Sequence, residues 1–452
     1  MVSNSTNIKL QVEISYKQIL KIAFPIAASI LVPQINFITN NIFLGHLSEQ
    51  ALAIAGITGV YYLIFAAIGN GLNNGMQALL SRRAGENRMD EIGRLFHQGI
   101  FISLAIAFTG ILITYFVAPF VLRHTLHNEE NVKIALVFLY IRIWGLPVLY
   151  IYQMRNALLV GINQSRFLVV GAFAETLTNI ALDYCLIYGK FGLPRMGFNG
   201  AAIASVIAEF VGLIVIFGVM RWKGISRQLH LFKDIVFDAQ RARLVLDQSL
   251  PLILQYAISI ITWEFFYILI EHHGERALAI SNAMRNIFGL FGFLSWSFGA
   301  VANTMVSNII GQGMQNRVMP LVKMILTLSI SIALFLCLLL NLFPEVFLKV
   351  YGQGDDFIKA AIPVTRVVST ALVLTSLAVV WLNSVVGTGN SRINLYTEIV
   401  AIIVYSIFAY VTLEILNLPI TIGWMAEWFY WITMLVPSYL YMVSGKWKGR
   451  KI

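Results

Sequence analysis

Three polar residues lie four positions apart in a largely apolar stretch of the chain, residues 175–189, with the sequence ETLTNIALDYCLIYG. At this spacing Glu175, Asn179 and Asp183 share one face of a helix. If the stretch spans a membrane, each charge at bilayer depth costs at least about 2.5 to 3.5 kcal/mol, so the face should point into the protein or into a water-filled cavity. Such a face is suited to binding ions or protons.

An alternative is that Asp183 only forms a permanent ion pair, because buried acids are usually partnered whether or not they function. Arg142 is the candidate partner, since a rise of 1.5 Å per residue places it level with Asp183 in the preceding span. Glu175 would then have to carry the transported charge. Glu209, midway along the next span, has no partner that the sequence identifies.

Composition indicates a polytopic membrane protein. Of the 452 residues 58% are hydrophobic and 12% are charged, and the mean hydropathy is +0.76, whereas soluble proteins carry about 25% charged residues. Apolar runs of twenty or more residues recur along the chain and match the hydrocarbon core as helices. The two cysteines, Cys185 and Cys337, both fall in such runs, so neither a disulfide framework nor a metal cluster is predicted.

Twelve membrane-spanning helices are expected. They cover approximately residues 18–44, 51–80, 95–118, 134–157, 167–189, 198–220, 249–271, 277–306, 319–342, 358–385, 393–415 and 421–444. The expected domains are an amino-terminal six-helix lobe (1–222), a basic cytoplasmic linker (223–248) and a carboxy-terminal six-helix lobe (249–452). Most of the 32 Lys and Arg residues fall on the side that holds both termini, which predicts cytoplasmic termini. This topology explains the basic excess, and no nucleic-acid partner is expected.

The two halves of the chain are an internal repeat. Matching residues lie 226 positions apart: Pro25 and Pro251, the ALAI segments 51–54 and 277–280, Ser81 and Ser307, Gly85 and Gly311, and Gly161 and Gly387. Since six spans return the chain to its starting side, the repeats are parallel. Parallel repeats are typical of transporters that work by alternating access.

Other classes of membrane protein lack their signatures in this sequence. No GxxxxGK[ST] phosphate loop occurs, which argues against ATP as the energy source. Neither an HExxH metal set nor a nucleophile motif is present, so an intramembrane enzyme is not predicted. A channel would more naturally show one repeated filter loop.

Several segments resemble the multidrug and toxic compound extrusion (MATE) family: residues 24–56 (FPIAASILVPQINFITNNIFLGHLSEQALAIAG), 178–205 (TNIALDYCLIYGKFGLPRMGFNGAAIAS), 275–290 (ERALAISNAMRNIFGL) and 306–313 (VSNIIGQG). The likeness covers essentially the whole chain. It implies a monomeric exporter of amphipathic, often cationic small molecules in the bacterial inner membrane, with two six-helix lobes in a V. Inward flow of Na+ or H+ would drive export, with no other cofactor. Flippases or exporters of lipid-linked, polysaccharide or metabolite substrates share that fold and are the alternative.

The resemblance also implies an amino-terminal cation site. Asn179 and Asp183 match its fifth-span residues, but the first-span acid of the family is replaced by Asn40, and Glu175 is the expected compensating acid. Hard cations take several oxygen ligands, whereas a proton needs one carboxylate. The amides of Asn40 and Asn179 and the hydroxyl of Thr178 slightly favour sodium, and either ion remains possible.

In the second lobe the family's acid position, eight residues after Pro251, is Ser259 here. Glu264, Arg285 and Arg366 should all lie about 12 Å from the outer surface, counting 1.5 Å per residue. They are expected to form an ion-paired cluster with a structural or gating role. The tryptophans near Glu427, which are Trp424, Trp428 and Trp431, are interpreted as an interfacial belt.

Overall fold

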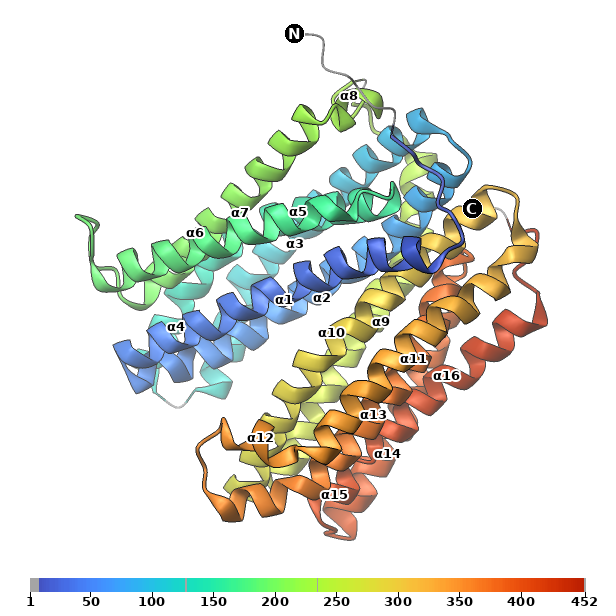
Figure 1. The fold of residues 1–452 in the computed structure, drawn as a ribbon. Coiled ribbons are helices and arrows are strands. Elements are labelled where there is room, and N and C mark those ends of the chain that lie inside the picture. The colour runs from blue at the N-terminus through green and yellow to red at the C-terminus, as the bar shows by residue number, and fades with distance from the viewer. Residues whose placement is uncertain (1–7, 127, 234, 451–452) are drawn as a thin grey trace. The chain divides into compact units, whose positions relative to one another are not determined.

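Long helices make up nearly all the regular structure of the computed structural model, which describes residues 8–126, 128–233 and 235–450 (Figure 1). The α-helices of the first half are α1 (Tyr16–Leu47), α2 (Glu49–Gly85), α3 (Met89–Thr125), α4 (Glu129–Arg142), α5 (Leu146–Gly161), α6 (Leu168–Tyr188), α7 (Phe198–Trp222) and the short α8 (Ile225–Gln228). In the second half they are α9 (Ala239–Glu271), α10 (Glu275–Gly311), α11 (Val318–Leu342), α12 (Pro344–Lys349), α13 (Asp355–Gly387), α14 (Ser391–Tyr410), α15 (Ile420–Gly423) and α16 (Ala426–Ser444). The described residues form no strand, so the all-α prediction is confirmed.

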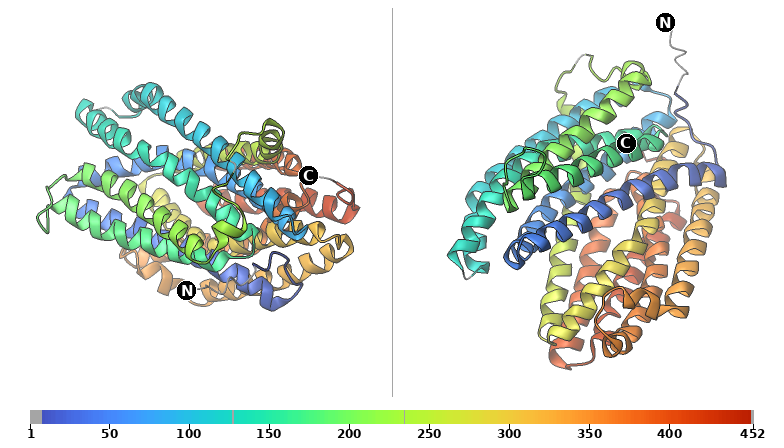
Figure 2. Two further views of the ribbon diagram at one scale, coloured as in Figure 1. Left: turned by 90° about the horizontal axis from the view of Figure 1, so that it is seen from above. Right: turned by 60° about the vertical axis from the view of Figure 1, so that its left-hand side comes forward.

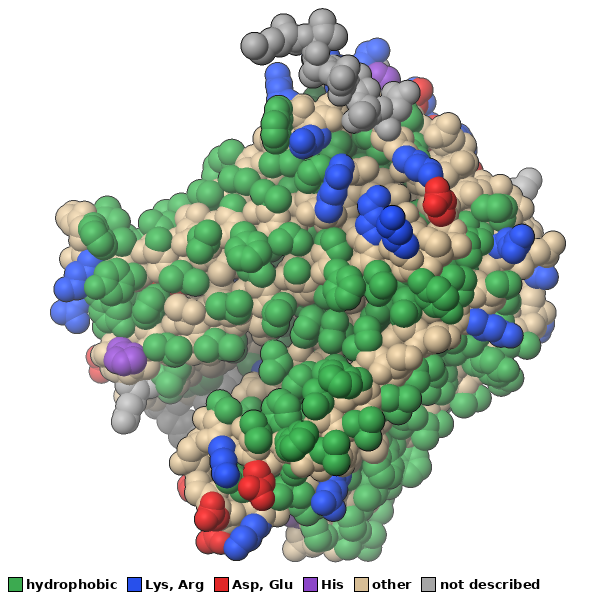
Figure 3. Space-filling view, viewed as in Figure 1, with side chains coloured by type: hydrophobic (Ala, Val, Ile, Leu, Met, Phe, Trp, Pro, Cys, Tyr) green, Lys and Arg blue, Asp and Glu red, His purple; other side chains and the backbone are tan. Residues whose placement is uncertain are grey.

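Within the described residues, eleven helical segments are long and apolar enough to cross a membrane. One of them, Glu129–Gly161, joins α4 and α5 through a single 3-10 turn, Ile143–Gly145. The twelfth expected span corresponds to α16, which is 19 residues long and rich in Trp and Tyr. In Figure 3 hydrophobic side chains cover the flanks of the helices, and charged side chains gather near helix ends. This distribution suits flanks that face lipid.

Contacts divide the chain into two compact units. The first comprises Ala28–Ser249 and the amino-terminal residues up to Leu10, and the second comprises Gln11–Ala27 and Leu250–Ile452. The unit boundary therefore falls inside α1 and inside α9, close to the repeat-related Pro25 and Pro251. Views from other directions show the long helices of each unit running side by side (Figure 2).

The expected linker, 223–248, is partly helical. It contains α8, and α9 begins within it at Ala239. The carboxylate Oδ1 of Asp238 accepts hydrogen bonds from the backbone N–H groups of Gln240 and Arg241 (2.9 and 3.0 Å) and so caps the new helix. Donation from the Arg241 backbone also holds the pKa of Asp238 below its usual value.

Close packing of α6 against α7 positions the polar face of α6. A Cβ atom on Gly212 would lie 2.9 Å from Cβ of Glu175, and one on Gly200 would lie 2.8 Å from the carbonyl carbon of Leu186. The absence of side chains at these two glycines allows the helices to approach closely. The resulting antiparallel register places Asp183 opposite the alanine-rich start of α7, residues 201–204.

In the second unit α10 and α13 are the most buried helices. Their most apolar 18-residue windows are 61% and 72% buried, respectively. α13 packs against α10, α11, α14 and α16. The remaining long helices are therefore arranged around a central pair, and α9, α14 and α16 bring polar side chains to one cavity, described below.

Candidate functional site

Asp183 is a fully buried acid with no partner in the described part of the chain. Its exposed fraction is 0%, and neither carboxylate oxygen has a hydrogen-bond partner there. Asn179, one turn earlier on α6, is also buried, and its Nδ2 donates to Oγ of Ser205 (3.4 Å). Glu175 lies two turns earlier on the same side of the helix and is half-buried. The Oδ1 atom of Asn179 is also buried and unpartnered. Three buried oxygens without donors thus lie on adjacent turns of α6.

The other predicted members of this site are less closely defined. Asn40 is half-buried on α1, and its Oδ1 is unpartnered in the described residues. One turn later, Phe43 ties α1 to α6, because its carbonyl accepts from the Tyr188 hydroxyl (2.7 Å) and its ring lies 6.2 Å from that of Tyr184. Thr178 is half-buried beside Asn179 in sequence. No hydrogen bond joins Asn40 or Thr178 to Asp183 in the described structure.

Arg142 does not pair with Asp183, so the permanent ion pair considered from the sequence is wrong. Its guanidinium binds Glu209 on α7 through two hydrogen bonds, of 3.1 and 2.5 Å, and lies 3.9 Å from the ring centroid of Tyr62. The error came from using depth alone. The 3-10 turn after Arg142 and the absence of a side chain at Gly145 let α7 approach, since a Cβ there would lie 2.6 Å from both charged groups.

Glu175 belongs to a second polar group in the same unit. Its carboxylate interacts with the Tyr152 hydroxyl. Arg155, which is fully buried, stacks over the Tyr152 ring with its guanidinium carbon 3.9 Å from the centroid. None of the guanidinium nitrogens of Arg155 has a hydrogen-bond partner among the described residues. Because eight residues separate Glu175 from Asp183, the two acids lie about 12 Å apart along α6 and cannot bind one ion together.

The expected cluster of Glu264, Arg285 and Arg366 does not form. No ion pair joins Glu264 to either arginine in the described structure, and its Oε1 atom is buried without a partner. Arg285 instead lies over the rings of Trp263 (5.1 Å) and Tyr267 (5.6 Å), and Arg366 is exposed. Equal depth did not place these side chains on facing sides of their helices, so the ion-pair prediction was wrong.

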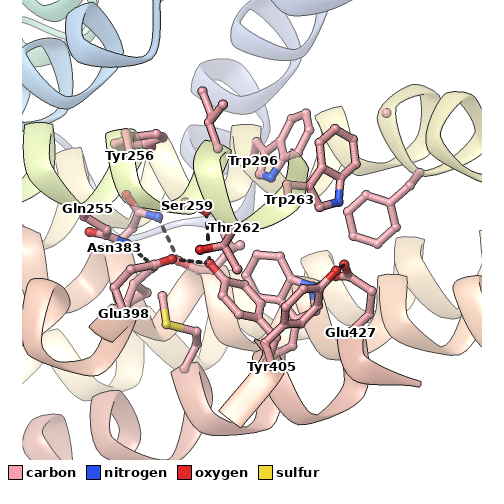
Figure 4. Close-up of a pocket in the computed structure, with 18 of the residues that line it drawn as sticks. Gln255, Tyr256, Ser259, Thr262, Trp263, Trp296, Asn383, Glu398, Tyr405 and Glu427 are labelled. Atoms are coloured by element: carbon pink, nitrogen blue, oxygen red, sulfur yellow. Dashed lines mark hydrogen bonds between the residues drawn. The ribbon is translucent and has the colours of Figure 1, made fainter. Parts of the chain in front are cut away.

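Two carboxylates of the second unit were not singled out from the sequence. Glu398, 1% exposed, accepts from the Tyr430 hydroxyl (2.7 Å) and from Nε2 of Gln255 (3.1 Å). Glu427 accepts from the Tyr405 hydroxyl (3.2 Å) and from Nε1 of Trp431 (3.1 Å). Figure 4 shows both acids at the wall of one cavity.

A signal for these acids was present in the sequence. Glu398 and Glu427 both lie inside expected spans, and an ionisable residue there indicates a functional site by default. Interpreting the nearby tryptophans as an interfacial belt left no reason to treat Glu427 as a candidate site residue. Trp424 is 1% exposed and donates to Oγ of Ser281 (3.0 Å), so it is a buried core residue rather than part of a belt.

These features define a polytopic helical membrane protein with an internal repeat and buried carboxylates in both units, which is the organisation of a secondary transporter. The MatE family model matches residues 25–185 and again residues 251–411, at the same offset of 226 as the repeat. The chain therefore belongs to the MatE (multidrug and toxic compound extrusion) family of transporters.

Curated relatives are named as multidrug resistance proteins. The chain is 21% identical over 445 residues to the probable multidrug resistance protein NorM of Thermotoga maritima, covering 96% of this chain and 94% of that protein. It is 26% identical to the probable NorM of Synechocystis over 220 residues, which are 48% of this chain and 47% of that protein. Multidrug resistance protein MdtK of Yersinia pestis is 24% identical over 307 residues, with 66% and 65% coverage.

Solved structures share the fold. An outward-facing multidrug resistance MATE family transporter of the MOP superfamily aligns with a TM-score of 0.86 at 18% identity, covering 97% of this chain and 98% of that one. A MOP superfamily transporter from Pyrococcus furiosus aligns with the same TM-score and identity, covering 98% and 97%. Two-repeat helical architecture is thus confirmed for this chain.

Proposed function

We propose that the protein is a secondary antiporter that exports amphipathic organic cations in exchange for inward Na+ or H+ by alternating access. The family membership and the names of the relatives support export of drug-like compounds. The coupling part of this proposal rests on the full burial of Asp183 without a hydrogen-bond partner in the described structure. A carboxylate fully buried in a spanning helix without a permanent partner can change its occupancy during a transport cycle.

The oxygens around Asp183 fit a monovalent cation. Both carboxylate oxygens of Asp183 and Oδ1 of Asn179 are buried and accept no hydrogen bond from the described residues. Hard cations prefer such oxygens, so Asp183 and Asn179 would hold Na+, with Asn40 and Thr178 as further oxygen donors. A proton requires only the carboxylate of Asp183, and both ions remain within the proposal. Glu175, in its separate group with Tyr152, would serve as a second coupling acid.

Dye uptake into inverted vesicles tests the function, with sodium and pH gradients imposed separately. The wild-type protein should move a cationic dye against its gradient under at least one of them. We expect Asp183→Asn and Glu175→Gln each to abolish gradient-driven movement, because each removes an exchangeable charge. Glu271→Gln, at the exposed end of α9, is the matched control and should transport normally.

The outcomes separate the parts of the proposal. Normal transport by Glu175→Gln would remove that residue from the coupling site. Normal transport by both variants would place coupling in the second unit. If the wild-type protein moved no organic cation under either gradient, the flippase alternative would be favoured.

We also propose that both chain ends lie in the cytoplasm of a bacterial inner-membrane protein. The support is the concentration of basic residues on their side of the expected topology. After replacement of Cys185 and Cys337, single cysteines at Lys448 and at Asp355 would be labelled with a membrane-impermeant maleimide. Inverted vesicles should label Lys448→Cys and intact cells Asp355→Cys, and the opposite pattern would overturn the orientation.

A further inference from the structure

The linker between α7 and α9, which contains α8 (Figure 1), is fixed to α3 by buried polar side chains. Nε2 of His97 lies 2.8 Å from the carbonyl oxygen of Leu231, a buried residue. The buried side chain of Gln98 donates to the carbonyl of Val236 (2.9 Å) and accepts from the backbone N–H of Asp238 (3.0 Å). These hydrogen bonds hold the linker backbone against α3, so the outward direction of its other side chains is defined.

Large apolar side chains of the linker point away from the protein. The set, which we call the linker patch, is 54% to 68% exposed and consists of Phe232, Ile235, Val236 and Phe237. Exposed apolar side chains that gather in one place mark a surface that binds another protein or a membrane. The linker patch is therefore a candidate interaction surface.

Two ring contacts show where the linker patch lies along the spans. The ring of Phe232 is 6.2 Å from that of Phe217 on α7, and the ring of Phe237 is 6.0 Å from that of Phe101 on α3. Both partner residues lie inside expected membrane spans, within about 10 Å of the span ends at 1.5 Å per residue. The patch is thus at the level where the hydrocarbon core meets the lipid headgroups.

The patch also continues the apolar flanks of these two helices. Ile214 lies about one turn from Phe217 and Phe108 lies two turns from Phe101, so each pair shares one side of its helix. Ile214 and Phe108 are both more than half exposed. Because such flanks face lipid in a membrane protein, this continuity favours lipid as the partner of the patch.

Exposed basic residues lie in the linker and at the end of α7. They are Arg221, Lys223, Arg227 and Lys233, and none of them forms an ion pair in the described part of the chain. Nζ of Lys223 lies 4.1 Å from the ring centroid of the exposed Trp222. Tryptophan is typical of the membrane interface, and clusters of four or more basic residues next to a span attract anionic lipids.

Described acids at this end of the first unit have other partners. Asp90 contacts the ring of His230 (2.9 Å). Arg241 binds both Glu91 (2.8 Å) and Asp238. The four basic side chains therefore stay available to the phosphate groups of lipids.

We propose that the linker patch and these four basic side chains form an interfacial anchor that binds anionic phospholipids. The apolar side chains enter the top of the acyl-chain region, and the basic side chains contact lipid phosphate groups. Each basic residue near an anionic surface strengthens the attraction by about fivefold, so phosphatidylglycerol gathers here in preference to phosphatidylcholine. This binding requires only the membrane-spanning fold and is independent of the proposed transport activity.

Fluorescence quenching of the purified full chain in lipid nanodiscs tests the anchor. Val236→Cys, made after replacement of Cys185 and Cys337 by Ala, carries an environment-sensitive fluorophore. The nanodiscs consist of phosphatidylcholine and a small, equal share of one quencher lipid, which is phosphatidylglycerol or phosphatidylcholine with a nitroxide near the top of an acyl chain. Both quenchers should reduce the emission, and the labelled phosphatidylglycerol should do so about twofold or more strongly.

Charge variants separate the two parts of the anchor. When its four basic residues are all changed to Gln, the preference for phosphatidylglycerol should disappear, while quenching by labelled phosphatidylcholine should remain. The matched control changes to Gln four exposed basic residues at the opposite helix ends of the same unit, which are Arg123, Lys133, Lys190 and Arg195. This control should keep the wild-type preference.

An apolar variant completes the test. Phe232→Ser/Phe237→Ser changes two exposed side chains, so it should fold normally, and it should weaken quenching by both lipids. Emission that neither quencher reduces in the wild-type background would place the patch in water and overturn the anchor. Equal quenching by the two lipids, or a preference that survives in the four-Gln variant, would overturn the assignment to anionic phospholipid.

Discussion

The two units descend from one repeated sequence yet hold their buried charges in different ways. In the first unit Arg142 and Glu209 form an ion pair, and Asp183 has no partner in the described structure. In the second unit Glu398 and Glu427 are held only by neutral donors around a cavity. Most of these charged residues correspond to small or apolar residues at the repeat-equivalent position, 226 residues away. The equivalent pairs are Glu175 and Ala401, Asp183 and Ala409, Arg142 and Val368, Glu209 and Leu435, Ala172 and Glu398, and Ala201 and Glu427.

Because equivalent helices carry a charge in one unit and none in the other, the fold of a unit does not depend on any one of these charges. What it does require is conserved volume at helix contacts. If Gly212 carried a Cβ atom, that atom would lie only 2.9 Å from the Cβ atom of Glu175. The equivalent pair in the second unit is Ser438 and Ala401, so a larger residue on one helix accompanies a smaller one on the other. The two units thus differ at equivalent positions of this helix contact.

The largest expected effect comes from breaking the buried ion pair between Arg142 and Glu209 in the first unit. Arg142→Val alone leaves Glu209 buried and uncompensated, and should lower the free energy of unfolding by about 3 to 5 kcal/mol. Thermal unfolding in detergent, followed by the loss of helical circular dichroism, measures the change. Arg142 is 15% exposed at its side chain and Glu209 is 8% exposed, so solvent offers little relief.

The double variant Arg142→Val/Glu209→Leu is the control, because it copies Val368 and Leu435 of the second unit. Replacing a buried ion pair by apolar residues of suitable shape is often neutral, so this variant should recover most of the lost stability. If the double variant were as unstable as the single one, the pair would be needed for more than mutual charge compensation.

A smaller effect is expected from filling the contact between α6 and α7. Gly212→Ala places a Cβ 2.9 Å from Cβ of Glu175 and 3.3 Å from the carbonyl oxygen of Gly171. Overpacking of this kind typically costs about 1 to 3 kcal/mol. Gly218→Ala on the same helix is the control, since its Cβ would meet nothing within 4 Å, and it should not destabilise.

Combining Gly212→Ser with Glu175→Ala reproduces the Ser438 and Ala401 pair of the second unit. The Cβ atom of residue 175, which lies closest to an added Cβ at position 212, remains in this variant. We therefore expect the double variant to be no more stable than Gly212→Ala in the same unfolding assay. A double variant clearly more stable than Gly212→Ala would show instead that the glutamate atoms beyond Cβ cause the crowding.

Much of the fold was predictable because it depends on regular signals. The expected span at 198–220 corresponds to α7, Phe198–Trp222, and that at 319–342 corresponds to α11, Val318–Leu342. Apolar length fixes such helices within a few residues. The offset of 226 between Pro25 and Pro251 identified the repeat that the family model matches twice. The start of α9 was missed because the capping of its first turn by Asp238 lies outside the apolar run.

Partners of the buried side chains were less predictable. Depth placed Arg142 within an expected span but could not show which helix it faces, and Glu209 is its partner in the structure. Glu264 and Arg285 are expected at similar depths, yet Arg285 lies over the ring of Trp263. A sequence gives position along a helix axis, whereas pairing also depends on helix rotation and on close approaches such as that at Gly145.

The smallest expected effect concerns the neutral donors of the second unit. Tyr405, 2% exposed, donates its hydroxyl to Oε1 of Glu427, and Tyr405→Phe removes this donor with almost no change in shape. Trp431 still donates to the other oxygen, so we expect a loss of only about 1 to 2 kcal/mol in the free energy of unfolding. Tyr410→Phe, on the same helix but 46% exposed, should leave stability unchanged. An effect of Tyr405→Phe as large as that of Arg142→Val would mean that neutral donors and an ion pair hold buried carboxylates equally strongly in the two units. Such a result would contradict the contrast between the units. Loss of Arg142 leaves the charge of Glu209 unpaired, whereas loss of the Tyr405 hydroxyl removes only one neutral donor from Glu427.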